Sequence, residues 1–121
     1  MANTFKTVTF AAEPASAGTP YVMYTVGGST TTVVLGLVLA NIHTTSVTTE
    51  VELVSTTSAR GGNNNVANGT SFLIKDVTIP SGSSLEVLSG SKVILETGDK
   101  IQIDCSVADK LSGTLSIMEI T

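Results

Sequence analysis

Short runs in which apolar and polar residues alternate recur along this chain, and they constrain its fold more than any other feature. The clearest runs cover residues 47–53, 85–87, 92–96 and 100–105. A period of two places one row of side chains on a buried face and the other row in water, as in a β-strand that covers a core. The alternation therefore predicts an all-β fold.

Turn residues divide the chain at intervals of about 8–12 residues, as expected for an antiparallel sandwich. Residues 31–41 form the most apolar run and lack clean alternation, so we expect a central strand covered on both faces. A glycine separates a strand over residues 85–88 from another over 92–96. Gly98 and Asp99 form the signal of a two-residue hairpin. The sequence predicts an antiparallel β-sandwich of about eight strands, either jelly-roll or Ig-like.

The chain has 121 residues, which is the size of one domain. We expect residues 21–121 to form the sandwich and residues 1–20 to form an N-terminal strand or arm with a spacer. The apolar residues of this segment have no hairpin partner nearby in the sequence, so the arm would reach another subunit by strand addition. The alternative is that residues 5–10 pair within their own sandwich.

The candidate interface residues come from three places in the sequence. Three are apolar residues of the expected arm, and two are tyrosines of the next strand that suit a sheet or an interface equally well. One is an arginine in a polar loop over residues 56–68, since loops of this length are usually functional or disordered. The residues expected at an interface are Phe5, Val8, Phe10, Tyr21, Tyr24 and Arg60.

Charged residues are scarce, at 13% of the chain, and the formal net charge is −4. A mildly acidic chain argues against nucleic acid and anionic membranes as partners, because both require clustered Lys and Arg. Thr and Ser replace charge on the expected surface. Such a surface suits packing against copies of the same chain, because repulsion between subunits is small. An ordinary secreted β-domain would have a similar composition.

The N-terminal segment does not have the pattern of a signal peptide. Glu13 and Pro14 follow Lys6 before an adequate apolar stretch forms. The longest apolar run, residues 33–40, is far shorter than the ~20 residues that a membrane-spanning helix needs. We therefore expect assembly in a bacterial-type cytoplasm, with later exposure as part of a particle.

Residues suited to catalysis or metal binding are few. His43 is the one histidine and Cys105 the one cysteine, so neither a Ser–His–Asp or Cys–His site nor a zinc site is expected. Cys105 lies in an alternating run and is expected to be a buried free thiol. Glu50 and Glu52 lie about 7 Å apart on one strand face, a spacing that would suit the two carboxyl groups of a glycosidase. A strand face exposed to solvent explains the pair more simply. We expect no enzyme activity, no cofactor and no bound metal.

Several segments of the chain resemble small virion structural proteins of tailed bacteriophages, especially those of cyanobacterial and marine phages. The resemblance rests on the start Met-Ala-Asn-Thr-Phe-Lys and on residues 35–41, 73–85, 95–101 and 115–121. It covers strands and turns over most of the chain, and the family has no catalytic residues to carry over. The resemblance implies a non-enzymatic component of a phage particle.

The residues and the resemblance together lead us to expect a virion protein, most simply a trimeric decoration (cement) protein on the outside of a phage capsid. Its partners would be other copies of itself and the major capsid protein. A neck, tail or baseplate accessory protein, bound to neck or tail proteins, is the first alternative. A monomeric module that binds host glycans is the second. That module would show Tyr21 or Tyr24 on an open groove, whereas a structural subunit would bury them at a contact.

Overall fold

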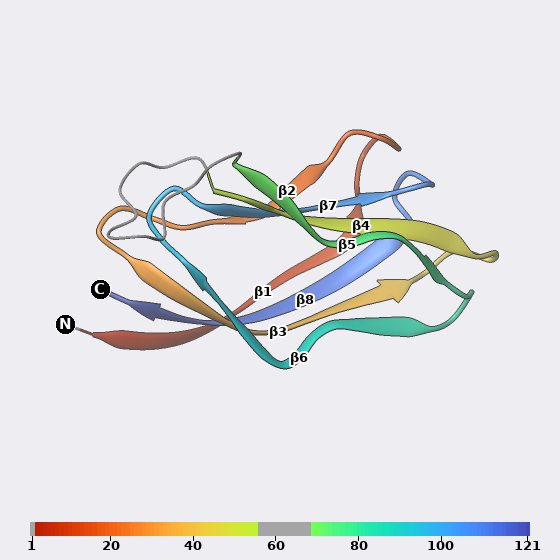
Figure 1. The fold of residues 1–121 in the computed structure, drawn as a ribbon. Coiled ribbons are helices and arrows are strands. Elements are labelled where there is room, and N and C mark those ends of the chain that lie inside the picture. Colours follow the sequence, from red (N-terminus) through yellow and green to blue (C-terminus); the bar gives the residue numbers. More distant parts are fainter. Residues whose placement is uncertain (1, 56–68) are drawn as a thin grey trace.

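The computed structural model describes residues 2–55 and 69–121, and every regular element in these ranges is a β-strand. The strands are β1 (Asn3–Glu13), β2 (Tyr21–Thr25), β3 (Thr31–Asn41), β4 (Val47–Val54), β5 (Thr70–Ile79), β6 (Ser84–Leu95), β7 (Lys100–Cys105) and β8 (Leu111–Ile120). They form two four-stranded sheets that face each other (Figure 1). The predicted antiparallel β-sandwich of about eight strands is confirmed.

The order of the strands identifies the sandwich as a jelly roll. Sheet I has the order β1-β8-β3-β6 and sheet II has the order β2-β7-β4-β5. Consecutive strands lie in opposite sheets, except β4 and β5, which pair with each other. Eight strands that alternate between two sheets in this way are typical of the jelly roll, whereas constant-type Ig-like sandwiches have sheets of four and three strands. Of the two predicted options, the chain adopts the jelly roll.

Strand β3 occupies the predicted central position, between β8 and β6 in sheet I. The prediction that both its faces are covered is wrong, because Val38 is 36% exposed on the outer face. The ladder register shifts between Val34 and Gly36 toward both neighbouring strands. This β-bulge places the buried Val34 and Leu37 three residues apart, so it removes the clean alternation from the sequence.

Two predicted turns have a different role in the structure. Residues 85–88 and 92–96 are not separate strands, because β6 runs through both segments and Gly90 interrupts it with a φ of 81°. Gly98 and Asp99 do not form a hairpin, because the strands on either side of them, β6 and β7, lie in opposite sheets. The turn nevertheless uses the conformational freedom of glycine, since Gly98 has a φ of 88°.

The N-terminal segment is an edge strand of this sandwich. Strand β1 pairs with β8 from Asn3↔Ile120 to Glu13↔Leu111, with a register shift after Phe10. The two chain ends lie side by side (Figure 1), where Ala2 and Thr121 exchange two backbone hydrogen bonds of 2.9 and 3.0 Å. Residues 5–10 therefore pair within their own sheet, which was the alternative to a free arm.

Aliphatic side chains fill the space between the sheets, as the scarcity of aromatic residues requires. The largest fully buried side chains are Leu37, Leu39, Ile79, Leu95, Ile101, Ile103, Leu111, Leu115, Ile117, Val34, Val47 and Val51. Cys105 is a free thiol and 3% exposed, so its predicted burial is confirmed. The inward positions of β4 and β7 alternate with polar outward ones, and this is the pattern that the sequence displays.

Candidate functional site

Four apolar side chains form one row across the outer face of sheet I. Phe5 on β1 is the register partner of Met118 on β8, Met118 is the partner of Val33 on β3, and Val33 is the partner of Ile94 on β6. Cross-strand partners point to the same face of a sheet. We call these four residues the apolar row.

The apolar row faces solvent because the neighbouring positions on each strand face the core. Phe5 is 72% exposed and Ile94 is 51% exposed, whereas Val33 and Met118 are half-buried by their neighbours. Single exposed apolar residues are common, but a contiguous apolar patch that spans a whole sheet marks an interaction surface more often. The row therefore makes the outer face of sheet I the candidate interface of the described structure.

The outer faces of the two sheets differ strongly in charge. On sheet I the outward strand positions carry Glu86 and Lys92, both on the edge strand β6, and the rest are Thr, Ser, Asn, Ala, Gly or apolar residues. On sheet II the outer face carries the charged residues Glu50, Glu52, Lys75, Asp76, Lys100 and Asp104. Of the charged residues at outward strand positions that the structure describes, six therefore lie on sheet II and two on sheet I.

Tyr24 closes one end of the sandwich by linking the two sheets. Its hydroxyl donates to Glu119 Oε2 at 2.5 Å and accepts from Thr32 Oγ1 at 2.8 Å, because a phenol has one proton to give. Lys6 Nζ forms an ion pair with Glu119 Oε1 at 2.6 Å. Burial, reinforced by the Glu119 carboxylate, raises the pKa of Tyr24 to about 12. The Lys6 ammonium and then the Tyr24 hydroxyl hold the pKa of Glu119 below its ordinary value.

The structure distributes the predicted interface residues between core and surface. Phe5 lies exposed in the apolar row. Phe10 is 7% exposed and belongs to the core, where its ring packs edge-on against Tyr21 with centroids 5.3 Å apart. Val8 and Tyr24 are half-buried and pack against the same core. In the isolated chain the Phe10 side chain is therefore not accessible to a partner, because the alternation along β1 directs it into the core.

The remaining candidate, Arg60, lies outside the described residues, as does the polar loop over residues 56–68 that carries it. Tyr21 also lines a shallow surface pocket of about 140 Å³ next to Glu13 and Pro20. Tyr24 has its hydroxyl engaged within the chain. The Tyr24 hydroxyl is therefore engaged within the sandwich, whereas Tyr21 is half-buried between the core and the shallow pocket.

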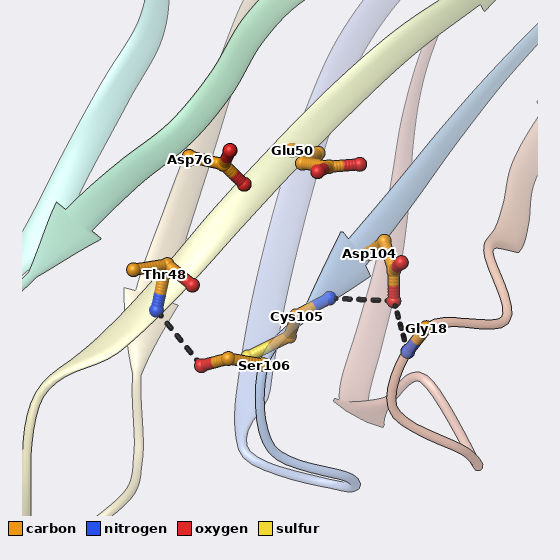
Figure 2. Close-up of a pocket in the computed structure, with 7 residues that line it drawn as sticks. All are labelled: Gly18, Thr48, Glu50, Asp76, Asp104, Cys105 and Ser106. Atoms are coloured by element: carbon orange, nitrogen blue, oxygen red, sulfur yellow. Dashed lines mark hydrogen bonds between the residues drawn. The ribbon is translucent and has the colours of Figure 1, made fainter.

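A second shallow pocket, of about 200 Å³, lies at the end of sheet II where β7 leaves it (Figure 2). Its lining residues are Gly18, Thr48, Glu50, Asp76, Asp104, Cys105 and Ser106. Asp104 Oδ1 accepts from the backbone N–H of Gly18 at 3.1 Å and from that of Cys105 at 2.8 Å. Ser106 Oγ accepts from the N–H of Thr48 at 3.0 Å. These polar atoms join the loop before β2 and strand β4 to strand β7.

The acidic residues of this pocket do not form a metal site. Glu50 already accepts a hydrogen bond from Lys75 Nζ at 2.9 Å. Within residues 2–55 and 69–121, no group of three or more His, Cys, Asp or Glu side chains is placed to hold a metal ion. His43 lies in the loop after β3 and is not among the pocket-lining residues. The pocket is therefore a boundary where the loop before β2, strand β4 and strand β7 contact one another.

Asp99, which the sequence pattern places only in a turn, is a buried residue whose hydrogen bonds connect several loops. Its side chain is fully buried, and Oδ1 accepts from Ser55 Oγ at 2.8 Å while Oδ2 accepts from the N–H of Glu96 at 2.9 Å. Its carbonyl oxygen accepts from the N–H of Val26 at 2.9 Å, and the N–H of Gly98 donates to the carbonyl of Val26 at 3.1 Å. One aspartate thereby joins three connections of the jelly roll. The Gly-Asp pair signalled the turn, but no local pattern signals a contact with Ser55.

None of the described residues forms a helix of the length and hydropathy that crossing a membrane requires.

Comparison with known proteins rests on structure, because no protein-family model and no curated protein sequence matches this chain. One similar solved chain comes from Bacillus endospore appendages, which are disulfide-linked pili, with 17% identity and a TM-score of 0.47 over 99% of this chain and 87% of that chain. Another belongs to infectious bursal disease virus, Gx strain, with 13% identity and a TM-score of 0.52 over 96% of this chain. The match spans 32% of that viral chain. At such identity the viral likeness shows a shared fold and nothing more.

Proposed function

We propose that this chain is a non-enzymatic structural subunit of a virus particle that works by self-association. The observation that carries the proposal is the outer face of sheet I, which spans four strands, holds the apolar row and is nearly free of charge. Proteins that remain monomeric rarely present such a face. The described residues also hold no group of three or more His, Cys, Asp or Glu side chains that could bind a metal ion.

The fold agrees with this role. Jelly rolls of eight strands are common in viral capsid proteins, although they also occur in lectins and cupins. The viral chain that shares the fold comes from a virus particle, which is consistent with a particle component. The resemblance of several sequence segments to small virion proteins of tailed phages supports the same class independently.

Within that class, we propose capsid decoration by a homo-oligomer that binds the lattice of the major capsid protein; the trimer expected from the sequence stays a prediction. A chain with low charge and a Thr- and Ser-rich surface can pack many copies closely on a lattice, since like-charge repulsion between them is small. A neck, tail or baseplate position uses the same properties and is the alternative within the class. The host-glycan module has less support, because Tyr24 is engaged within the sandwich and Tyr21 packs on Phe10.

The test combines the mass of the purified protein with its position on particles. Sedimentation velocity over a range of concentrations should show a homo-oligomer, and immunogold electron microscopy should label phage heads from a lysate of the host. Label confined to necks or tails would favour the alternative placement. A monomer at every concentration, together with unlabelled particles, would contradict the proposed function.

A further inference from the structure

We propose that the outer face of sheet I packs against the same face of another copy of this chain. The inference rests on the proposed self-association and adds to it one surface and one occupant. The face is built by β1, β8, β3 and β6, and the apolar row crosses it from Phe5 at one edge to Ile94 at the other. Three properties of the face favour a second copy of this chain as its occupant: its size, its charge and its contrast with sheet II.

The size of the face matches what a stable contact between subunits requires. Its strands contain 11, 10, 11 and 12 residues in the order β1, β8, β3 and β6. A rise of about 3.3 Å per residue and a spacing of about 4.8 Å between strands give a flat face of roughly 35 by 19 Å, or about 650 Å². Specific interfaces bury about 600 to 1,000 Å² on each partner. One sheet face from each copy is therefore sufficient.

The charge of the face permits contact between identical copies. Glu86 and Lys92 are the charged outward residues of sheet I in the part of the chain that the structure describes, and their charges cancel. Two copies that bring this face together therefore meet little net repulsion, and the Glu86 of one can approach the Lys92 of the other. Both residues lie on the edge strand β6, so the centre of the face, around Val33 and Met118, stays free of charge.

Sheet II lacks these properties. Its outer face carries four acidic and two basic residues, so two copies of it would repel each other at close range. Its most exposed large apolar residue on the strands, Phe72 at 48%, lies under the Lys75 ammonium, which is 4.6 Å from the ring centroid. The apolar surface on sheet II is thus already partly covered by a cation, whereas the apolar row on sheet I has no such cover among the described contacts.

Contact between two sheet I faces would bury apolar side chains in the same way as the core between the two sheets does. Sheets packed face to face lie about 10 Å apart with interdigitated side chains. The half-buried Val33 and Met118 and the exposed Phe5 and Ile94 would supply the apolar centre, surrounded by Thr and Ser that form a polar rim.

Two substitutions test the face, and a third serves as the matched control. Ile94→Glu and Phe5→Glu each place a carboxylate in the apolar row at positions more than half exposed, so the fold should survive, as circular dichroism and thermal unfolding will check. Phe72→Glu makes the same change at a residue of similar exposure on sheet II. Sedimentation velocity should show that both row variants weaken association by about 100-fold or more, because a buried unpaired charge opposes contact, while Phe72→Glu associates like the wild type.

Oxidation of methionine provides a second measurement that needs no variant. Met118 is half-buried in the row, whereas Met23 is 6% exposed in the core. Hydroxyl-radical footprinting should show Met118 oxidised several-fold more slowly at concentrations where the chain is assembled than at high dilution, with Met23 slow in both. Unchanged oxidation of Met118 upon assembly would overturn the assignment of this face.

The outcomes separate this inference from the proposed function. If the wild type assembles and the row variants assemble equally well, or if Phe72→Glu alone disrupts assembly, the face is wrong while self-association stands. If the wild type stays monomeric at every concentration, self-association itself fails, and this inference fails with it.

Discussion

Gly113 on β8 faces the core directly beneath the ring of Phe10, its register partner on β1. A Cβ atom at position 113 would lie 2.5 Å from Phe10 Cζ and 3.2 Å from Leu39 Cδ2. Ordinary contacts of a Cβ begin at about 3.4 Å, so the ring would have to move by about 1 Å. The ring is also held by its edge-on contact with Tyr21. Gly113→Ala therefore forces a well-packed aromatic side chain out of its place.

The expected cost follows from these contacts. Overpacking a core costs typically 1–3 kcal/mol, and an overlap with an aromatic ring belongs near the upper end. Alanine regains about 0.4–1 kcal/mol by restricting the unfolded chain. We expect Gly113→Ala to lower the free energy of unfolding by about 2 kcal/mol. Urea unfolding at a single protein concentration measures this, because self-association would otherwise contribute to the apparent stability.

Two further variants make the test specific. Gly36→Ala on the neighbouring strand β3 is the matched control, since the nearest atom to its new Cβ is Leu88 O at an ordinary 3.5 Å. It should change stability by less than about 0.5 kcal/mol. In a Phe10→Leu background the ring is absent, so the cost of Gly113→Ala should fall by about 1 kcal/mol or more. Equal stability of the Gly113→Ala and Gly36→Ala proteins would mean that β1 does not pack on β8, and it would refute the reasoning.

Four other predictions concern buried polar and titratable groups. Asp99→Ala should lower the free energy of unfolding in urea by about 2–5 kcal/mol, because it removes the acceptor of two hydrogen bonds, one buried and one partly buried; a loss below about 1 kcal/mol would contradict this role. Stability should fall as pH rises from 10.0 toward about 12, because the folded state favours the neutral phenol of Tyr24, and Tyr24→Phe should remove that part of the alkaline loss. Stability should also fall as pH drops through and below 4.5, because the folded state favours the ionised Glu119, and Glu119→Gln should reduce this acid loss. Cys105 should react slowly with a thiol reagent in the native protein and rapidly in urea, because burial both hides the thiol and raises its pKa; rapid native labelling would show that the strand end is open.

The strands were predictable wherever one face meets the core and the other meets water. Residues 47–53 and 100–105 alternate in the sequence because Val47, Val51, Ile101 and Ile103 fill the space between the sheets. Strand β3 was recognised as central, but its bulge near Gly36 removed the alternation and concealed its solvent-facing side. Local pattern therefore identified most strands and failed where the backbone departs from a regular ladder.

The sheet order and the candidate interface depend on contacts that are distant in sequence. Nothing near Gly98 and Asp99 shows that β6 and β7 separate into different sheets, so the pair looked like a hairpin. Phe5 was identified from its apolar character alone, but its neighbours in the apolar row lie up to 113 positions away and become visible only through the register with β8. Phe10 has the same character as Phe5 and points the opposite way, because β1 is a strand of the sheet and not a free arm.

Native mass spectrometry of the purified chain over a range of concentrations tests the central claim most directly. The account predicts a pair of 12.4 kDa chains, or a larger assembly that contains such pairs, because contact between identical faces joins two copies, and it predicts that the Ile94→Glu variant dissociates while the folded monomer remains. A wild-type protein that shows the mass of one chain at every concentration would contradict it.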